Sequence, residues 1–222
     1  MKKFLLLISI VALSTTMMAQ GPYAGVIIRP QSAWIINNDD FDSGDYDLDI
    51  PFAMAFGVQG GYMFSEAFGL VTQIIFSPQG QAYILADSEE KVSIENKYVN
   101  VPILARLRGG GEKAGFVLHF GPQIGFLTSS NVVFDTSTEF NEDWSDYYKN
   151  TVFSLVLGLG ANIMLTEYLS LDLMVNIDGG FTEIETELGK AELFDYDDNG
   201  RAMALNAVAS FSIGVNYVFT SE

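Results

Sequence analysis

The residues best suited to chemistry in this chain are one histidine and a set of acidic, basic and amide side chains that alternate with large apolar residues. Ser154, His119 and Asp172 are the residue types that form a nucleophile, a base and an orienting acid in a hydrolytic triad. The chain, however, reaches His119 and Asp172 shortly after tight turns, and it reaches Ser154 after a long loop. In a meander of antiparallel strands such positions lie at opposite ends, so the pattern argues against a triad and favours a polar interior.

Polar side chains recur on one face of successive segments, where they alternate with Phe, Leu and Ile. We expect this face to hold a polar network of Arg106, His119, Gln123, Asn162, Asp172 and Asn176. Arg29 and Asp178 are expected on the same face. A charge buried in a narrow interior needs a partner, so pairing of Arg with Asp is the first interpretation. A gated conduit lined by these charges is the alternative, and the sequence leaves it open.

One acidic turn resembles part of a calcium-binding loop. Asp195, Asp197 and Asn199, followed by Gly200, match its first, third, fifth and sixth positions. The twelfth position is Asn206 instead of the bidentate Glu, and the flanking residues have strand character. The segment therefore fails as an EF-hand and predicts at most weak binding of divalent cations, with an ordinary Asp/Asn/Gly turn as the alternative. No cofactor motif is present, and we expect no cofactor.

The elements that must position these side chains are eight segments of alternating apolar and polar residues. Such alternation indicates strands with two different faces. Short turns alternate with long acidic loops over residues 37–50, 86–95, 129–150 and 182–201. We therefore predict an all-β fold, an eight-stranded antiparallel up-and-down transmembrane β-barrel with its large apolar residues facing lipid. The expected strands span residues 23–36, 51–64, 68–85, 96–108, 115–128, 151–165, 169–178 and 202–219.

The first nineteen residues have the three-part layout of a secretory signal peptide. Lys2 and Lys3 form a basic start, an apolar run follows from Phe4 to Leu13, and small residues precede a cut after Ala19. The apolar run is shorter than the roughly 20 residues that a membrane-spanning helix needs. We therefore expect residues 1–19 to be a signal peptide and residues 20–222 to form one barrel domain.

The net charge of the chain limits the kinds of partner that it can bind. The formal net charge is −17, and loss of Lys2 and Lys3 with the signal peptide would make it more negative. Such a field repels phosphate backbones, which argues against nucleic-acid binding. It favours basic partners and divalent cations at the loops, where most of the 28 acidic residues lie. The chain has no cysteine, so disulfides play no part.

Three stretches resemble the PorT-like family of outer-membrane β-barrels. They are Tyr98-Val-Asn-Val-Pro-Ile-Leu, the strand from Gly115 to Phe126 with its Gly121-Pro122 pair, and Leu157-Gly-Leu-Gly together with Leu169-Ser-Leu-Asp-Leu. The resemblance covers most of residues 21–219. It implies a barrel in the outer membrane of a Gram-negative cell, and the family takes its name from a protein linked to a secretion apparatus. The motifs are structural, so the resemblance implies little about activity.

Three functions remain in competition. The first is a non-enzymatic barrel embedded in outer-membrane lipid, with a structural or interaction role through its acidic loops in a secretion or envelope assembly. The second is a narrow porin-like channel for small solutes. The third is a barrel enzyme, which would need a nucleophile, a base and an acid together at one rim. A lumen filled with paired charges would favour the first, and a continuous wet channel would favour the second.

Overall fold

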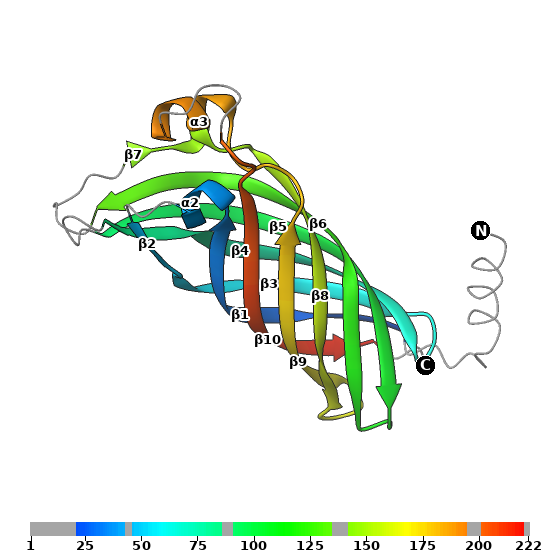
Figure 1. Cartoon of the computed structure of the whole chain (residues 1–222). Helices are drawn as coiled ribbons and strands as arrows, with labels where there is room; N and C mark the ends of the chain where they lie inside the picture. The colour runs from blue at the N-terminus through cyan, green and yellow to red at the C-terminus, as the bar shows by residue number, and fades with distance from the viewer. Residues whose placement is uncertain (1–20, 43–45, 86–90, 135–141, 195–200, 220–222) are drawn as a thin grey trace.

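The ring of the fold is made of eight antiparallel strands that close on themselves. We describe a computed structural model of the chain, and it describes residues 21–42, 46–85, 91–134, 142–194 and 201–219. The ring pairs β1 with β10, β10 with β9, β9 with β8, β8 with β6, β6 with β5, β5 with β4, β4 with β3 and β3 with β1. This closed ring confirms the predicted fold class (Figure 1). The ring strands are β1 (Gly21–Ile36), β3 (Phe52–Met63), β4 (Phe68–Leu85), β5 (Lys91–Gly110), β6 (Ala114–Phe134), β8 (Thr151–Met164), β9 (Leu169–Gly180) and β10 (Leu205–Val218).

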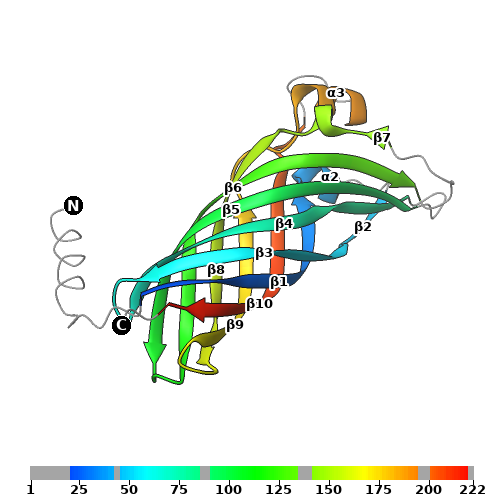
Figure 2. The same cartoon turned by 180° about the vertical axis from the view of Figure 1, so that it is seen from behind.

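The two ends of the ring differ. Tight turns join β3 to β4, β5 to β6 and β8 to β9 at one end, which we call the short-turn end; β1 begins and β10 ends there (Figure 2). The other end, the long-loop end, carries five small elements between the strands. They are α2 (Asn38–Asp42), β2 (Tyr46–Asp49), β7 (Glu142–Asp143), the 3-10 turn η1 (Ser145–Tyr147) and α3 (Glu187–Phe194). Among the described residues, no helix is both long enough and apolar enough to cross a membrane.

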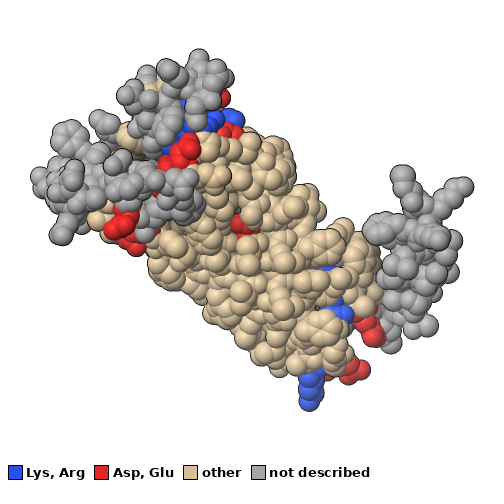
Figure 3. All heavy atoms as spheres, in the orientation of Figure 1, with Lys and Arg blue, Asp and Glu red and all other residues tan. Residues whose placement is uncertain are grey.

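The outer surface of the ring is apolar and its interior is polar. Phe52, Phe116 and Leu159 are all at least 60% exposed, whereas Arg29, Arg106 and Asp172 are at most 4% exposed. On the face that Figure 3 shows, most charged residues gather at the two ends, and the surface between them is almost free of charge. The shortest ring strands have 12 residues, and at about 3.3 Å per residue and a 45° tilt they span about 28 Å. That length matches the apolar band of a transmembrane barrel.

Aromatic side chains border this band at the short-turn end. Phe64 stacks between Tyr62 and Phe68, with ring centroids 5.1 and 5.8 Å apart. On the other side of β1, Tyr217 lies between Tyr168 and Phe219, at 6.2 and 5.0 Å. Aromatic rings of this kind are typical of the level where a bilayer meets water.

The structure corrects the predicted loops. β5 begins at Lys91, and β6 continues to Phe134, so parts of the expected loops 86–95 and 129–150 are strand. The polar composition of these segments hid the extension, because only every second residue packs inward. Ile94 and Val132 are those inward residues, at 5% and 0% exposure. β6, with 21 residues, therefore extends well beyond the apolar band.

The long-loop end has an apolar core of its own, and we call this assembly the cap: α2, η1, α3 and the outer ends of the strands around this core. Its buried side chains come from segments far apart in sequence, which ties the connections to one another. They are Ile35, Tyr83, Ile94, Tyr98, Val132, Tyr148, Val152, Ile184 and Ala204.

The lipid-facing surface predicts a depth-dependent cost for a buried charge. Val175 lies in the middle of β9 and is 59% exposed. We expect Val175→Arg to lower the free energy of unfolding by about 2–4 kcal/mol, because the guanidinium would face hydrocarbon. Denaturant unfolding in lipid bilayers measures it. Leu165→Arg, at the short turn after β8, is the matched control and should cost at most about 1 kcal/mol; equal costs at both positions would contradict the membrane level assigned to β9.

Candidate functional site

The lumen holds a buried ion pair in its half nearer the short-turn end. Nη1 and Nη2 of Arg106, in β5, donate to the two carboxylate oxygens of Asp172, in β9, at 2.9 and 2.8 Å. Asn162 and Asn216 each donate an amide hydrogen to the same carboxylate, at 2.8 and 3.0 Å. His119 lies with Nε2 3.0 Å from Nη1 of Arg106. The Asp172 carboxylate thus accepts four hydrogen bonds from three different strands, which fixes its position across the barrel.

Amide side chains continue this network toward the opposite wall. Gln59, in β3, donates to Oδ1 of Asn216 at 2.6 Å, and Gln73, in β4, donates to Oε1 of Gln59 at 2.9 Å. All three residues are at most 6% exposed. The hydrogen bonds therefore cross the lumen from β5 through β9, β10 and β3 to β4.

A second ion pair lies closer to the long-loop end. Nη2 of Arg29 donates to both carboxylate oxygens of Asp178 at 3.2 Å, and it donates to Oγ of Ser210 at 2.7 Å. Asn176 donates to Ser212 at 3.0 Å and lies 3.5 Å from Ser210. The side chains of Arg29 and Asp178 are 3% and 4% exposed, so this pair forms a further polar layer across the interior.

The residues of the considered triad do not come together. Ser154 accepts a hydrogen bond from Gln123 at 3.0 Å, and these two residues face each other in the β6–β8 ladder. His119 faces Gly158 in the same ladder, four residues from Ser154 along β8. That spacing corresponds to roughly 13 Å. Gln123 and Asn176 thus contact other parts of the lumen. They do not join the group formed by Arg106, His119, Asn162 and Asp172.

Glycines on the lumen wall do not leave a free path. A Cβ atom added at Gly158 would collide with Oδ1 of Asn176, and one added at Gly125 would lie 2.8 Å from Oδ1 of Asn100. Neighbouring amide side chains therefore occupy the space that each glycine leaves. At the levels of the Arg106–Asp172 and Arg29–Asp178 pairs the lumen is filled by hydrogen-bonded side chains, as expected for eight strands.

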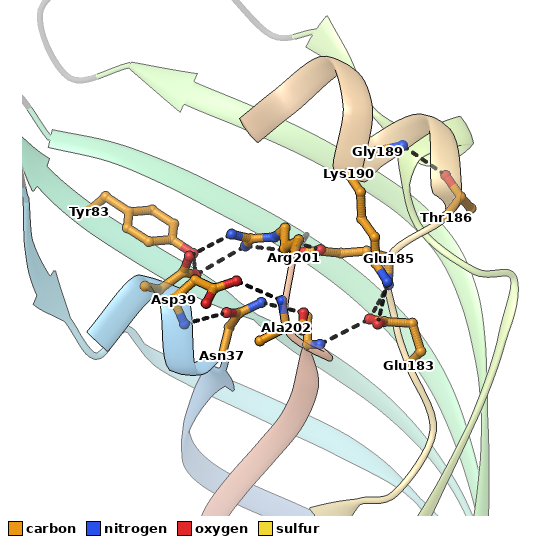
Figure 4. Close-up of polar contacts among 12 residues, drawn as sticks. Asn37, Asp39, Tyr83, Glu183, Glu185, Thr186, Gly189, Lys190, Arg201 and Ala202 are labelled. Carbon is orange, nitrogen blue, oxygen red and sulfur yellow. Dashed lines mark hydrogen bonds and ion pairs between the residues drawn. The ribbon is translucent and has the colours of Figure 1, made fainter. Parts of the chain in front are cut away.

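The cap is organised by one buried arginine, Arg201. It donates to Asp40 through Nη1 and Nη2 at 2.8 and 3.2 Å, and to Glu185 through Nε and Nη2 at 2.9 and 3.1 Å (Figure 4). Its side chain and that of Asp40 are 2% exposed, and that of Glu185 is 1% exposed. The hydroxyl of Tyr83, in β4, donates to Asp40 at 3.0 Å. Arg201 thereby joins α2, the segment before α3 and the outer end of β4.

Smaller contacts hold the same segments. Backbone groups of Ala202 bond to side chains near α2: its N–H donates to Asp39 at 2.6 Å, and its carbonyl accepts from Asn37 at 2.9 Å. Glu183 accepts from the backbone of Ala204 at 3.0 Å and pairs with Lys190 of α3 at 2.9 Å. These contacts fix both sides of the chain that carries Arg201.

The charges around Arg201 do not cancel, because two carboxylates surround one guanidinium in the described residues. Burial raises the pKa of Glu185, Arg201 lowers it, and the nearby carboxylates of Glu183 and Asp40 raise it further. The net direction is upward. The cap therefore holds closely spaced negative charge away from water, and it depends on the guanidinium to do so.

The candidate metal ligands Asp195, Asp197 and Asn199 lie outside the described residues. Among the residues that are described, no three His, Asp or Glu side chains group closely enough to hold a metal ion.

The site residues predicted from the sequence leave out several members of the lumen network and all members of the cap cluster. Gln59, Gln73, Ser210 and Asn216 lie on the polar faces of their strands, so the alternation contained a signal for them. The cap cluster of Asp40, Glu185 and Arg201 had no such signal, because its members lie in connecting segments where no period marks the inward side.

The family comparison agrees with this architecture. Residues 4–219 match the family model described as outer membrane protein beta-barrel domain. The chain belongs to this family. It is thus a small β-barrel of the outer membrane, and its outer wall contacts lipid. No curated protein matches the chain in sequence.

Solved structures of small outer-membrane barrels are similar over nearly the whole chain. OprG from Pseudomonas aeruginosa has 13% sequence identity and a TM-score of 0.46, covering 90% of this chain and 97% of its own. Ail of Yersinia pestis has the same identity, TM-score and share of this chain, and it is covered to 99%. The outer membrane protease OmpT from Escherichia coli has 8% identity and a TM-score of 0.48, with coverages of 93% and 99%.

The ion pair of Arg106 and Asp172 predicts that a shape-preserving substitution of Asp172 strongly lowers the stability of the barrel. Asp172→Asn keeps the side-chain shape but leaves Arg106 buried without its counter-charge, so we expect a loss of about 3–5 kcal/mol in the free energy of unfolding. Denaturant unfolding of the refolded barrel measures it. The double variant Arg106→Gln with Asp172→Asn removes both charges and should recover much of the loss. A double variant no more stable than Asp172→Asn alone would contradict a pairwise role for these charges.

The cap predicts a separable effect. Arg201→Gln leaves Asp40 and Glu185 buried without a cation, so we expect the cap to open while the ring stays closed. Limited proteolysis should then cut the long-loop segments at least about tenfold faster, with the ring fragment still heat-modifiable on gels. Lys91→Gln, which removes a half-exposed partner of Asp49 at the same end, is the control and should leave the cutting rate near that of the unaltered chain.

Proposed function

We propose that this protein is a non-enzymatic outer-membrane barrel that acts by presenting its cap to another protein. The observation that carries the proposal is the combination of a filled lumen with a cap that has its own apolar core and its own buried ion cluster. A connection that served only to link strands would need neither. A preorganised surface loses less conformational freedom on binding, which favours recognition.

The packed lumen speaks against the channel alternative. Two layers of ion-paired side chains cross the interior, one around Asp172 and one around Asp178, and amides fill the space next to the lumen glycines. A solute would have to break buried hydrogen bonds to pass, and each buried group left without a partner costs about 1–3 kcal/mol.

The enzyme alternative lacks an assembled site in the described residues. Ser154 bonds to Gln123, and His119 bonds to Arg106, so neither the nucleophile nor the base of the considered triad contacts the other. Nε2 of His119 accepts a hydrogen bond from the Arg106 guanidinium, which Asp172 already holds. This arrangement supports a structural role for the histidine.

We place the cap outside the cell, because outer-membrane barrels have short turns on the periplasmic side and longer loops outside. Among the described residues, the exposed acidic side chains at this end include Asp47, Glu95, Asp143, Asp146 and Glu187. This charge supports a partner with a basic surface. The motif around Tyr98 supports membership of the PorT-like subgroup, and with it a place in a secretion or envelope assembly. Residues 1–19 remain the predicted signal peptide.

The proposal predicts that a partner can be captured from the cap. A photo-crosslinking residue at Leu188 or Met203, which are 45% and 55% exposed, should give a discrete adduct in native cells. The adduct should weaken when Arg201→Gln opens the cap. A crosslinker at Glu112, in a short turn, is the control and should not capture the same protein.

The channel alternative gives the opposite outcomes. Purified protein in planar bilayers should then show steady conductance that a bulky substitution at Gly158 abolishes, with no cap-dependent adduct. We expect no stable conductance from the unaltered protein.

A further inference from the structure

The short-turn end of the barrel contains a small, partly open cavity. It lies among the first residues of β1 and β9 and the last residues of β3, β5, β8 and β10. Arg106 and Arg108 are its charged members, and Tyr23, Asn162, Ser170 and Asn216 add polar groups. The cavity lies on the opposite side of the Arg106–Asp172 pair from the cap.

Arg108 is buried there without an acidic partner. It is 9% exposed. Its Nε donates to Oδ1 of Asn162 at 3.2 Å, and its Nη2 donates to the turn carbonyls of Gly111 and Glu112 at 2.9 and 3.1 Å. All three acceptors are neutral. Within the described part of the chain, Nη1 of Arg108 makes no hydrogen bond, so this edge of the guanidinium remains available.

The charges lining the cavity do not balance. Arg106 and Arg108 are the charged residues that line the cavity, and among the described residues only Arg106 has a carboxylate partner, Asp172, which does not itself line the cavity. A buried guanidinium held only by neutral acceptors lacks the counter-charge that would offset its desolvation. This local excess of positive charge stands in a chain whose formal net charge is −17.

A second observation points to a ligand. Tyr23 lines the same cavity and is 7% exposed, and its ring lies under Arg106, whose Cζ is 5.4 Å from the ring centroid. The Tyr23 hydroxyl is fully buried; it interacts with the Arg106 guanidinium, and among the described residues no acceptor engages its hydrogen. The cavity thus combines an unused guanidinium edge of Arg108 with a hydroxyl hydrogen that has no acceptor, and both can donate hydrogen bonds.

We propose that this cavity binds an oxyanion, a phosphate or carboxylate group that enters from the short-turn side. Arg108 supplies the charge and two N–H groups from Nη1, and the Tyr23 hydroxyl supplies a further donor on the cavity wall. Guanidinium groups suit planar or tetrahedral oxyanions because their N–H groups form a fixed fork. The proposal is independent of the partner proposed for the cap, since it concerns the opposite end of the barrel.

The test uses the refolded full chain in a zwitterionic detergent and inorganic phosphate as the probe. Phosphate is titrated at constant ionic strength while the Nε–Hε resonances of the arginines are followed by NMR. We expect a saturable shift of the Arg108 resonance, identified by its loss in Arg108→Gln. That variant should bind phosphate at least about tenfold more weakly, and Arg108→Lys should lie between it and the unaltered chain.

Lys113→Gln is the matched control, because it removes one exposed positive charge from the turn next to Arg108. We expect it to keep the affinity for phosphate. Equal losses in Lys113→Gln and Arg108→Gln would overturn the site in favour of diffuse attraction, and so would a shift that does not saturate. If Arg108→Gln does not refold, the Arg108→Lys and Tyr23→Phe variants decide, and unchanged affinity in both would overturn the proposal.

The oxyanion could be free in solution or part of a lipid headgroup, and nanodiscs separate these sources. If the source is free, replacing phosphatidylcholine by phosphatidylglycerol should leave the phosphate affinity unchanged. Competition by phosphatidylglycerol, lost in Arg108→Gln, would support the same site and assign the lipid phosphate to it.

Discussion

The ion pair between Arg106 and Asp172 is the interaction on which the arrangement of the lumen depends. Hydrocarbon outside the ring offers no hydrogen-bond partner, so the strands must close on themselves and every inward polar group must find its partner inside. Asp172 meets this demand by accepting from three strands at once, and Asn216 passes the network on to Gln59. A guanidinium and a carboxylate that are fixed in this way also fix the relative register of the strands that carry them.

The two ends of the barrel hold their buried arginines in different ways. In the cap, two carboxylates surround Arg201, and acid is in excess. At the short-turn end, Arg106 pairs with Asp172, whereas Arg108 is held by neutral acceptors of Asn162 and the turn. The arginine of the cap is therefore enclosed by acids, and Arg108 lies beside a partly open cavity without an acidic partner among the described residues. That difference is the basis for proposing the cap as a surface for proteins and the cavity as a site for a small ion.

Alternation in the sequence was sufficient for the ring, because a strand that faces lipid on one side and a polar lumen on the other must alternate at every step. It placed Arg106, His119, Asn162 and Asp172 inward, but it could not show which of them meet, since this depends on the stagger between strands. The cap could not be predicted from the sequence, for a different reason. α3 and Arg201 lie in a segment rich in acids, and their packing follows tertiary contacts with Asp40 and Tyr83 that no local period records.

The origin of the stabilising groups decides where function can diverge. The ion pairs of the lumen come from ring strands, with Arg29 and Asp178 in one layer and Arg106 and Asp172 in the other. The ion cluster of the cap comes from connecting segments, through Asp40, Glu185 and Arg201. Substitutions in one set therefore need not disturb the other, and the ring can keep its fold while the cap changes its surface. If the cap is the recognition surface that we propose, the ring that anchors it in the membrane does not have to change when that surface does.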